Sequence, residues 1–151
     1  MKLSLPAINE TWTVTYKTSF RRKATVKILE QNEIMITSRI RDRKYVLHKW
    51  LQLKGRKHLI PWLDSLSAKT ALPYNKISIR GQRTRWGSCS EHNNINLNYK
   101  LLFLEPELVD YIIIHELCHT KHLNHSQEFW QLVAKFHPNH RDLRKQLRKH
   151  H

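Results

Sequence analysis

The chain has 151 residues, 40% of them hydrophobic, which allows one domain with a buried core or two small lobes that share one. The 27 Lys and Arg residues against 12 Asp and Glu give a net charge of +15, which predicts attraction to polyanions such as nucleic acid, ribosomes or anionic membranes. Two widely separated cysteines, Cys89 and Cys118, exclude a disulfide framework and a Cys-only zinc site, and they indicate reduced thiols in the cytoplasm.

The N-terminus does not suggest a targeting segment. The N-terminal sequence MKLSLPAINETW is unlike a signal peptide, because its apolar run is short and is broken by Pro6. No stretch approaches the ~20 apolar residues that a membrane span requires. We therefore expect a cytoplasmic protein. We assign no role to His150 and His151, because a terminal histidine pair can belong to a purification tag.

Alternating apolar residues predict three strands before residue 40. The alternating sets are Trp12, Val14 and Tyr16, then Ala24, Val26 and Ile28, then Ile34 and Ile36. Each strand should have one face toward solvent, and the short polar links between them predict an antiparallel meander.

From about Asp42 the apolar residues follow helical spacing. Gly55 is expected to end or bend a first helix, and a second helix should follow with Pro61 in its first turn. Residues 39–57 hold eight Lys or Arg and one acid, Asp42. We favour a solvated helix face over a nucleic-acid-binding stripe for this segment.

The second half of the chain predicts two strands and then three helices. Residues 76–80 (KISIR) and 94–99 (NINLNY) alternate as strands do. Residues 104–119 predict a buried helix, because apolar residues surround its axis and Pro106 suits its first turn. Ser126 is a good N-cap for the next helix, and a last basic helix covers about residues 139–149. The predicted fold class is α+β in one domain, with its N-terminal strands and helices over about residues 1–72.

The buried helix carries the sequence HELCH. His115 and His119 are four residues apart, so their rings leave the same face of the helix and can share one metal ion at ~2.1 Å each. Glu116 is then placed to act on a metal-bound water as a general base, which is the logic of the H-E-x-x-H motif. The competing interpretation is a pair of core histidines bonded to backbone carbonyls, with Glu116 at the surface.

A catalytic zinc needs a third protein ligand. We rank His125 first, Glu128 second and His122 third. His125 lies ~9 Å further along an unbroken helix, so it can reach the metal only if the helix ends near Lys121 and the chain turns back before Asn124.

Four segments in this order resemble the YgjP-like metallopeptidase family. They are RWGSCS at 85–90, INLNYKL at 95–101, PELVDYIIIHELCH at 106–119 and HSQEFW at 125–130. The family is similar to minimal zincin proteases and more distantly to SprT-like and WLM proteases, which act on DNA-bound proteins. The resemblance implies a zincin-like core over about residues 73–149 and hydrolysis of a protein or peptide substrate. It also implies a Zn²⁺ ion held by His115, His119 and His125, with Glu116 as the base.

Peptide hydrolysis also needs a donor for the developing oxyanion. Arg83, Arg85 and Tyr99 are the candidates, and the strand at 94–99 can pair with an extended substrate. Cys118 is expected to point into the core.

Two other functions compete with the peptidase. An endoribonuclease family spaces three histidines in the same way, at 0, +4 and +10, but it typically has Gly where this chain has Glu116. A non-catalytic nucleic-acid-binding module with a structural zinc would also suit the basic charge. The sequence predicts neither the substrate nor the oligomeric state.

Overall fold

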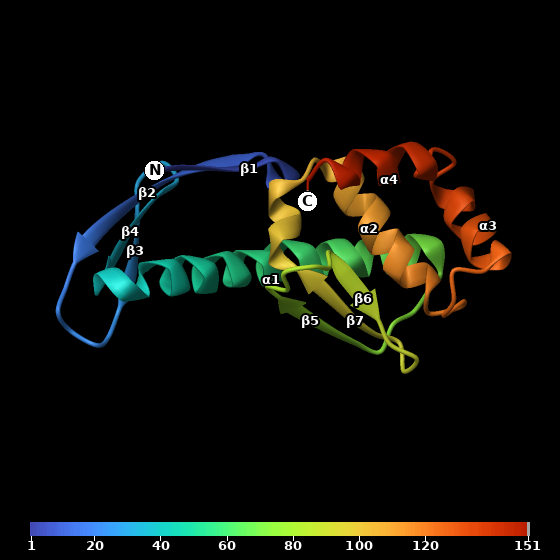
Figure 1. The fold of residues 1–151 in the computed structure, drawn as a ribbon, viewed down its shortest axis with the longest axis horizontal. Helices are drawn as coiled ribbons and strands as arrows, with labels where there is room; N and C mark the ends of the chain where they lie inside the picture. The colour runs from blue at the N-terminus through green and yellow to red at the C-terminus, as the bar shows by residue number, and fades with distance from the viewer. Residues whose placement is uncertain (151) are drawn as a thin grey trace.

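Two small β-sheets are connected by one long helix, α1 (Arg43–Thr70), which runs along most of the molecule (Figure 1). The computed structural model describes residues 1–150. At 1.5 Å per residue, the 28 residues of α1 span roughly 42 Å. The N-terminal sheet lies at one end of α1, and the second sheet and three shorter helices pack around its other half. These elements confirm the α+β fold class.

The N-terminal sheet is mixed rather than an antiparallel meander. Its strands are β1 (Lys2–Leu5), β2 (Glu10–Thr18), β3 (Thr25–Leu29) and β4 (Glu33–Ser38), in the order β1-β2-β4-β3. β1 pairs with β2 and β3 with β4 in antiparallel fashion, but β2 and β4 are parallel. The predicted strands are therefore right, whereas the predicted antiparallel meander is wrong.

Burial explains this strand order. Ile34 and Ile36 of β4 are fully buried, so β4 takes an inner position with neighbours on both sides. β3 lies at the edge, and its Val26 and Ile28 are 38% and 65% exposed, contrary to the buried face that their alternation predicts. Periodicity identified β3 as a strand, but only the packing decided whether its apolar side is covered.

Helix α1 continues through Gly55, where the sequence predicts an end or a bend, and through Pro61, which was expected in the first turn of a second helix. Gly55 is buried against η3 (Tyr99–Phe103), where an added Cβ would lie 3.0 Å from the Tyr99 Cβ. Pro61 lies inside the helix. Leu51, Leu59 and Leu63 are buried on either side of these positions. Their packing offsets the cost of Gly and Pro in a helix, about 1 and 3 kcal/mol, so the prediction of two helices is wrong.

The second sheet consists of β5 (Lys76–Arg80), β6 (Gly87–Cys89) and β7 (Asn94–Asn98) in the order β5-β7-β6. β7 is parallel to β5 and antiparallel to β6. The helices that follow are α2 (Pro106–Cys118), α3 (Gln127–Phe136) and α4 (His140–Arg148). Short 3₁₀ helices η1 (Pro6–Ile8) and η2 (Ile40–Asp42) complete the described chain.

Helix α2 lies at the centre of this half of the molecule, between the second sheet and helices α1, α3 and α4 (Figure 1). Ile113, Leu117 and Cys118 have no exposed surface, which confirms that the helix is buried and that Cys118 is a core residue. Trp62 of α1 donates a hydrogen bond to Asp110 of α2 and ties the two helices together. None of the helices in residues 1–150 is both long and apolar enough to cross a lipid bilayer.

Candidate active site

His115 in the last turn of α2 and His119, the C-cap of this helix, lie on one side, with ring centroids 5.0 Å apart. The helix ends at Cys118, and the amide of His119 donates to the carbonyl of Glu116 in a closing turn. The chain then turns until Ser126, whose hydroxyl accepts a hydrogen bond from the Phe129 amide and begins α3. The predicted helix end before Asn124 and the predicted Ser126 cap are confirmed.

This turn brings His125 back to the other two histidines. Its Nε2 lies 3.4 Å from Nε2 of His115, and its ring centroid is 4.7 Å from that of His119. One ring nitrogen from each of the three histidines lies within 4.8 Å of the others. Ligands at ~2.1 Å around a tetrahedral zinc are separated by roughly 3.4 Å, so the group is of a size that fits such an ion. Glu128 and His122 are not part of the group.

The side chain of His122 takes no part in this cluster, but its backbone does. Nδ1 of His119 lies 3.0 Å from the carbonyl oxygen of His122. A carbonyl can only accept, so this contact places the ring proton on Nδ1 and leaves the lone pair of Nε2 for a metal ion.

Two aromatic residues of α3 support the three rings, and the sequence analysis assigned them no such role. Phe129 is fully buried and stacks on His119 at 4.3 Å, with its edge contacts to His115 and His125 at 5.0 and 5.1 Å. Trp130 stacks on His125 at 5.8 Å. The sequence HSQEFW contained an indication of this packing, because Phe129 and Trp130 follow His125 by about one helical turn.

His115, which precedes Glu116, is a neutral imidazole because of its burial. Burial is the largest cause that lowers the pKa of His115, and together with the neighbouring His119 and His125 it brings this pKa to about 3. A neutral imidazole has a lone pair for a cation, which a protonated ring lacks.

Glu116 is 6% exposed and lies beside β6. Its burial raises its pKa to about 8, and the positive charge of Arg85 opposes this shift. Gly87 leaves room for it, since a Cβ there would lie 3.1 Å from Oε2 of Glu116. The prediction of a surface glutamate, which belonged to the core-histidine interpretation, is wrong.

The segment before β6 is held by Asn98, a buried polar residue that the sequence analysis did not single out. Its Nδ2 donates to the carbonyls of Gln82 at 2.7 Å and Arg85 at 2.9 Å. The amide of Asn98 also donates to the carbonyl of Trp86. These bonds fix the position at which the chain enters β6 beside Glu116.

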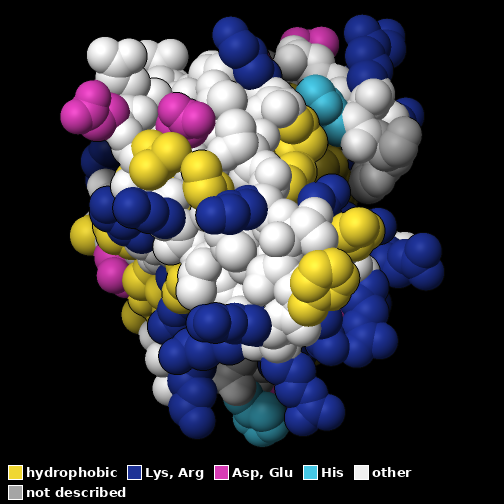
Figure 2. Space-filling view, turned by 90° about the vertical axis from the view of Figure 1, so that its left-hand side faces the viewer, with side chains coloured by type: hydrophobic (Ala, Val, Ile, Leu, Met, Phe, Trp, Pro, Cys, Tyr) yellow, Lys and Arg dark blue, Asp and Glu magenta, His cyan; other side chains and the backbone are white. Residues whose placement is uncertain are grey.

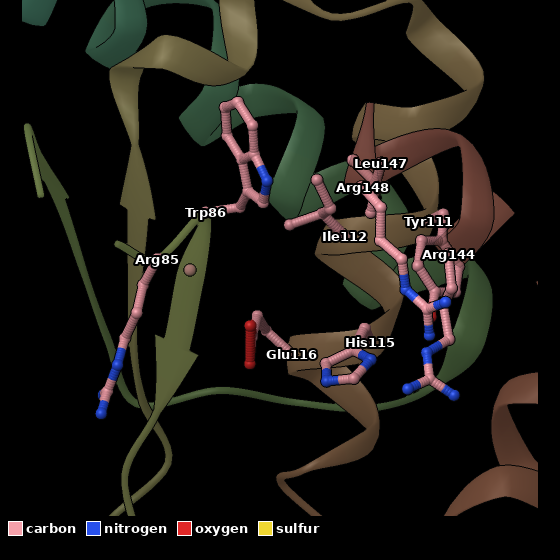
Figure 3. Close-up of a pocket in the computed structure, with 10 residues that line it drawn as sticks. Arg85, Trp86, Tyr111, Ile112, His115, Glu116, Arg144, Leu147 and Arg148 are labelled. Atoms are coloured by element: carbon pink, nitrogen blue, oxygen red, sulfur yellow. The ribbon is translucent and has the colours of Figure 1, made fainter. Parts of the chain in front are cut away.

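The three candidate oxyanion residues lie in different places. Arg85 lines the hollows on both sides of Glu116, but its guanidinium points away from His115 in Figure 3. Arg83 lines a separate depression. Tyr99 is buried against Gly55 and Gly81, with its ring 6.0 Å from that of His48, and it lines neither of the hollows beside Glu116.

The strand that the sequence suggested for substrate pairing is not at an edge. β7 is hydrogen-bonded to β5 on one side and β6 on the other, so it cannot accept a substrate strand. β6 and β5 are the two edge strands of this sheet, and β6 borders the hollow of about 390 Å³ that is lined by the three histidines and Glu116. We call this hollow the β6 groove.

A second cavity, of about 290 Å³, lies between β6, α2 and α4 (Figure 3). We call it the α2–α4 pocket, and it shares Arg85, Gly87, His115 and Glu116 with the β6 groove. Its remaining lining residues are Trp86, Tyr111, Ile112, Arg144, Leu147 and Arg148. Burial raises the pKa of the Tyr111 hydroxyl to about 12, although the positive charge of the nearby Arg144 opposes this shift, so the hydroxyl keeps its proton at neutral pH.

Residues 4–150 match the family described as YgjP-like, metallopeptidase domain. The chain belongs to the YgjP-like metallopeptidase family. The match covers nearly the whole chain, well beyond the segments that suggested the resemblance, and it identifies the protein as a metallopeptidase rather than a ribonuclease or a binding module. No curated protein matches the sequence.

Two solved structures share the fold. The metallopeptidase zymogen of Pyrococcus abyssi abylysin is 28% identical, with a TM-score of 0.51, over 56% of this YgjP-like chain and 87% of its own. The metallopeptidase zymogen of Methanocaldococcus jannaschii jannalysin is 20% identical, also with a TM-score of 0.51, over 58% of this chain and 90% of its own. The second likeness is one of fold alone. Both structures resemble only part of this chain, which is consistent with a minimal metallopeptidase fold that carries additional elements.

Proposed function

We propose that this YgjP-like protein is a zinc-dependent peptidase of the H-E-x-x-H type. His115, His119 and His125 would hold the Zn²⁺ ion, and Glu116 would act as the general base. The observation that carries the proposal is the group of three histidine nitrogens within 4.8 Å of one another, with Glu116 buried beside it. Three protein ligands leave one position open for water or substrate, as catalytic zinc sites do.

Zinc, when bound, lowers the pKa of a coordinated water and stabilises negative charge on the substrate carbonyl oxygen. The carboxylate of Glu116 takes a proton from the attacking water and later gives it to the amide nitrogen as that nitrogen leaves. A buried carboxyl with a raised pKa is a stronger base than an exposed one, and it retains the proton until the leaving group accepts it.

The substrate would lie in the β6 groove as an extended chain. The free edge of β6 offers backbone hydrogen bonds, and Glu116 lies directly behind Gly87 of this strand. Arg85 lies two residues before this strand, lines the β6 groove and remains our candidate for contact with the substrate.

Substitutions in the HELCH segment test this proposal. Glu116→Gln should retain stoichiometric zinc and lose hydrolysis of casein by at least about a hundredfold, because a general base contributes about 10²–10⁴. His119→Ala should lose zinc as well as activity. Atomic emission measures the zinc content of each variant. The release of labelled peptides from casein measures its hydrolysis.

His122→Ala is the matched control. It removes a neighbouring imidazole but keeps the backbone carbonyl that bonds to His119, so zinc content and activity should remain. Full activity in Glu116→Gln would exclude Glu116 as the base. Cleavage of structured RNA that is lost in Glu116→Gln, without any proteolysis, would overturn the peptidase proposal.

We also propose that the N-terminal end of the molecule binds nucleic acid. Figure 2 shows this end, where Lys and Arg side chains outnumber acidic ones. Arg21, Arg22 and Lys23 are exposed between β2 and β3, next to Phe20, which is 96% exposed. An exposed aromatic ring among cations suits stacking on a base beside phosphate contacts.

The salt dependence of DNA binding tests this second proposal. Replacing Arg21, Arg22 and Lys23 by Gln should weaken binding of a labelled single-stranded DNA and reduce the slope of log K against log salt by up to roughly 2. The control replaces Arg141 and Lys145 of α4 and Lys149 just after it by Gln, with the same loss of charge from exposed residues outside the N-terminal sheet. Equal weakening by both triple variants would show that binding depends on the net charge of the protein and would contradict a nucleic-acid site at the N-terminal end.

We propose the cytoplasm as the location of the protein. Cys89 and Cys118 are both free, and Cys118 is fully buried, which suits a compartment that keeps thiols reduced.

A further inference from the structure

The α2–α4 pocket opens beside the reacting groups and carries an excess of positive charge. His115 and Glu116 form one wall, and α4 contributes Arg144 and Arg148 on the opposite side (Figure 3). Glu116 is the only acidic residue in the lining. Within residues 1–150, neither Arg144 nor Arg148 forms an ion pair, so both guanidinium groups are available to an incoming anion.

Aromatic contacts hold one of these arginines in place. The guanidinium of Arg144 lies 4.5 Å from the centroid of the Trp130 ring, and the same ring stacks on His125 and on His140. A cation held over an indole ring loses less side-chain freedom when it binds a ligand, which favours recognition. The stack also links Arg144 to the histidine cluster through one rigid side chain.

The pocket contains a second donor without a protein acceptor. Tyr111 is 2% exposed, and its hydroxyl is buried with no hydrogen-bond partner. Tyr111 precedes His115 by one helical turn, so its ring lies on the same side of α2, with centroids 6.0 Å apart. A buried hydroxyl with no acceptor costs free energy, and a ligand oxygen in the pocket would remove that cost.

We infer that the α2–α4 pocket binds a carboxylate of the peptide substrate next to the scissile bond, through Arg144, Arg148 and the hydroxyl of Tyr111. Arginine forks and a phenolic hydroxyl are all donors, and a carboxylate is a pure acceptor that takes up to four hydrogen bonds. Two sources supply this group: the side chain of Asp or Glu, and the free C-terminus of a short peptide. The inference rests on the proposed peptidase function and names its substrate class.

Paired peptide substrates test the inference in the zinc-loaded, full-length protein. One pair differs only by Glu against Gln at each position around the cleaved bond, and the other only by a free against an amidated C-terminus. We expect kcat/KM to be at least about tenfold higher for the acid of one pair, since hydrogen bonds to charged groups are the stronger ones. A preference in the first pair identifies a side-chain carboxylate, and one in the second pair identifies the C-terminus.

Variants of the pocket locate the preference. Arg144→Gln with Arg148→Gln should reduce the ratio of acid to amide rates to about one, and Tyr111→Phe should reduce it by a few-fold. Lys145→Gln is the matched control, because it removes the same charge from the same helix without lining the pocket, and it should keep the wild-type ratio. A wild-type protein that cleaves both members of each pair equally, or a control variant that loses the preference as fully as the arginine variant, would overturn the inference.

A binding measurement separates this inference from the peptidase proposal. The Glu116→Gln variant cannot use its base, so the affinity of the labelled peptides is measured by fluorescence anisotropy without turnover. Tighter binding of the acidic peptides, lost in Arg144→Gln with Arg148→Gln, supports the pocket even if no peptide is hydrolysed by the wild type. Equal affinities would overturn the carboxylate pocket, whatever the protein hydrolyses.

Discussion

Gly87 is the residue on which the position of Glu116 depends most closely. A Cβ at this position would lie 3.1 Å from Oε2 of Glu116 and 3.1 Å from the carbonyl oxygen of Asn96. Because the Asn96 carbonyl belongs to the neighbouring strand β7, the carboxylate is the group that must give way. Glycine is required here by the close approach of a side chain rather than by a special backbone angle, since no glycine has a positive φ.

Gly87→Ala should therefore impair catalysis more than stability. A shift of a few tenths of an ångström at the base should lower kcat/KM for casein-derived peptides by roughly tenfold, because misplacement by about 1 Å costs about a hundredfold. Zinc content should remain at one ion per chain, since an added Cβ at position 87 would meet Glu116 and the Asn96 carbonyl before any of the three proposed ligands. Wild-type kcat/KM in this variant would show that Glu116 does not need its present position.

At the scale of elements, α1 shows how packing overrides helix propensity. The helix passes through Gly55, at which a chain read only for local preference should stop. Here Gly55 lets the helix backbone approach η3 and β5, so that Tyr99 and Ile79 pack directly against it. The missing side chain allows the contact, and the contact supports the helix.

Gly55→Ala is predicted to destabilise the protein, although Gly→Ala in a helix usually stabilises by about 0.5–1 kcal/mol. The new Cβ would lie 3.0 Å from the Tyr99 Cβ, 3.1 Å from Ile79 Cγ2 and 3.3 Å from the Tyr99 Cα. Moving that backbone costs about 1–3 kcal/mol, which exceeds the gain. Urea unfolding measures the difference.

Ser65→Ala provides the matched control for Gly55→Ala. Ser65 is exposed on the same helix, so alanine there adds helix propensity without a new contact and should stabilise the protein slightly. If Gly55→Ala also stabilised it, the close packing of α1 on η3 would not constrain this position.

At the scale of the whole molecule, one buried core connects the N-terminal part with the zincin-like part. Leu5 and Val14 of the N-terminal sheet, Leu59 of α1 and Ile113 of α2 belong to the same cluster. Lys54 of α1 adds an ion pair with Glu10 of β2 at 2.8 Å. These contacts support our proposal that residues 1–72 and 73–149 form a single domain.

Thermal unfolding of the full chain should therefore be one cooperative transition. The calorimetric and van 't Hoff enthalpies should agree, and near-ultraviolet and far-ultraviolet circular dichroism should give the same midpoint. Two separated transitions would divide the chain into two domains, near the boundary at residue 72. The metal-free protein is the form to measure, because release of a bound metal is coupled to unfolding and changes both the midpoint and the two-state criterion.

The sequence by itself determined the local part of this protein. The four-residue spacing of His115 and His119 places both rings on one side of α2, and the turn before Ser126 was readable from capping chemistry. The predicted meeting of His125 with this pair is what the structure shows, while metal binding by the three remains a prediction. Such features depend on residues within a few turns of one another, where helix geometry leaves few choices.

The tertiary structure alone decided what depends on distant contacts. It placed β4 between β2 and β3, kept α1 unbroken through Gly55, and made β6 rather than β7 the free edge beside Glu116. It also brought Arg144 of α4 to Tyr111 and His115 of α2, about thirty residues earlier in the chain. The spacing of apolar residues indicates which side of a helix or strand is apolar, but it does not indicate which other element covers that side. The covering element depends on how all the apolar surfaces of the chain are buried together.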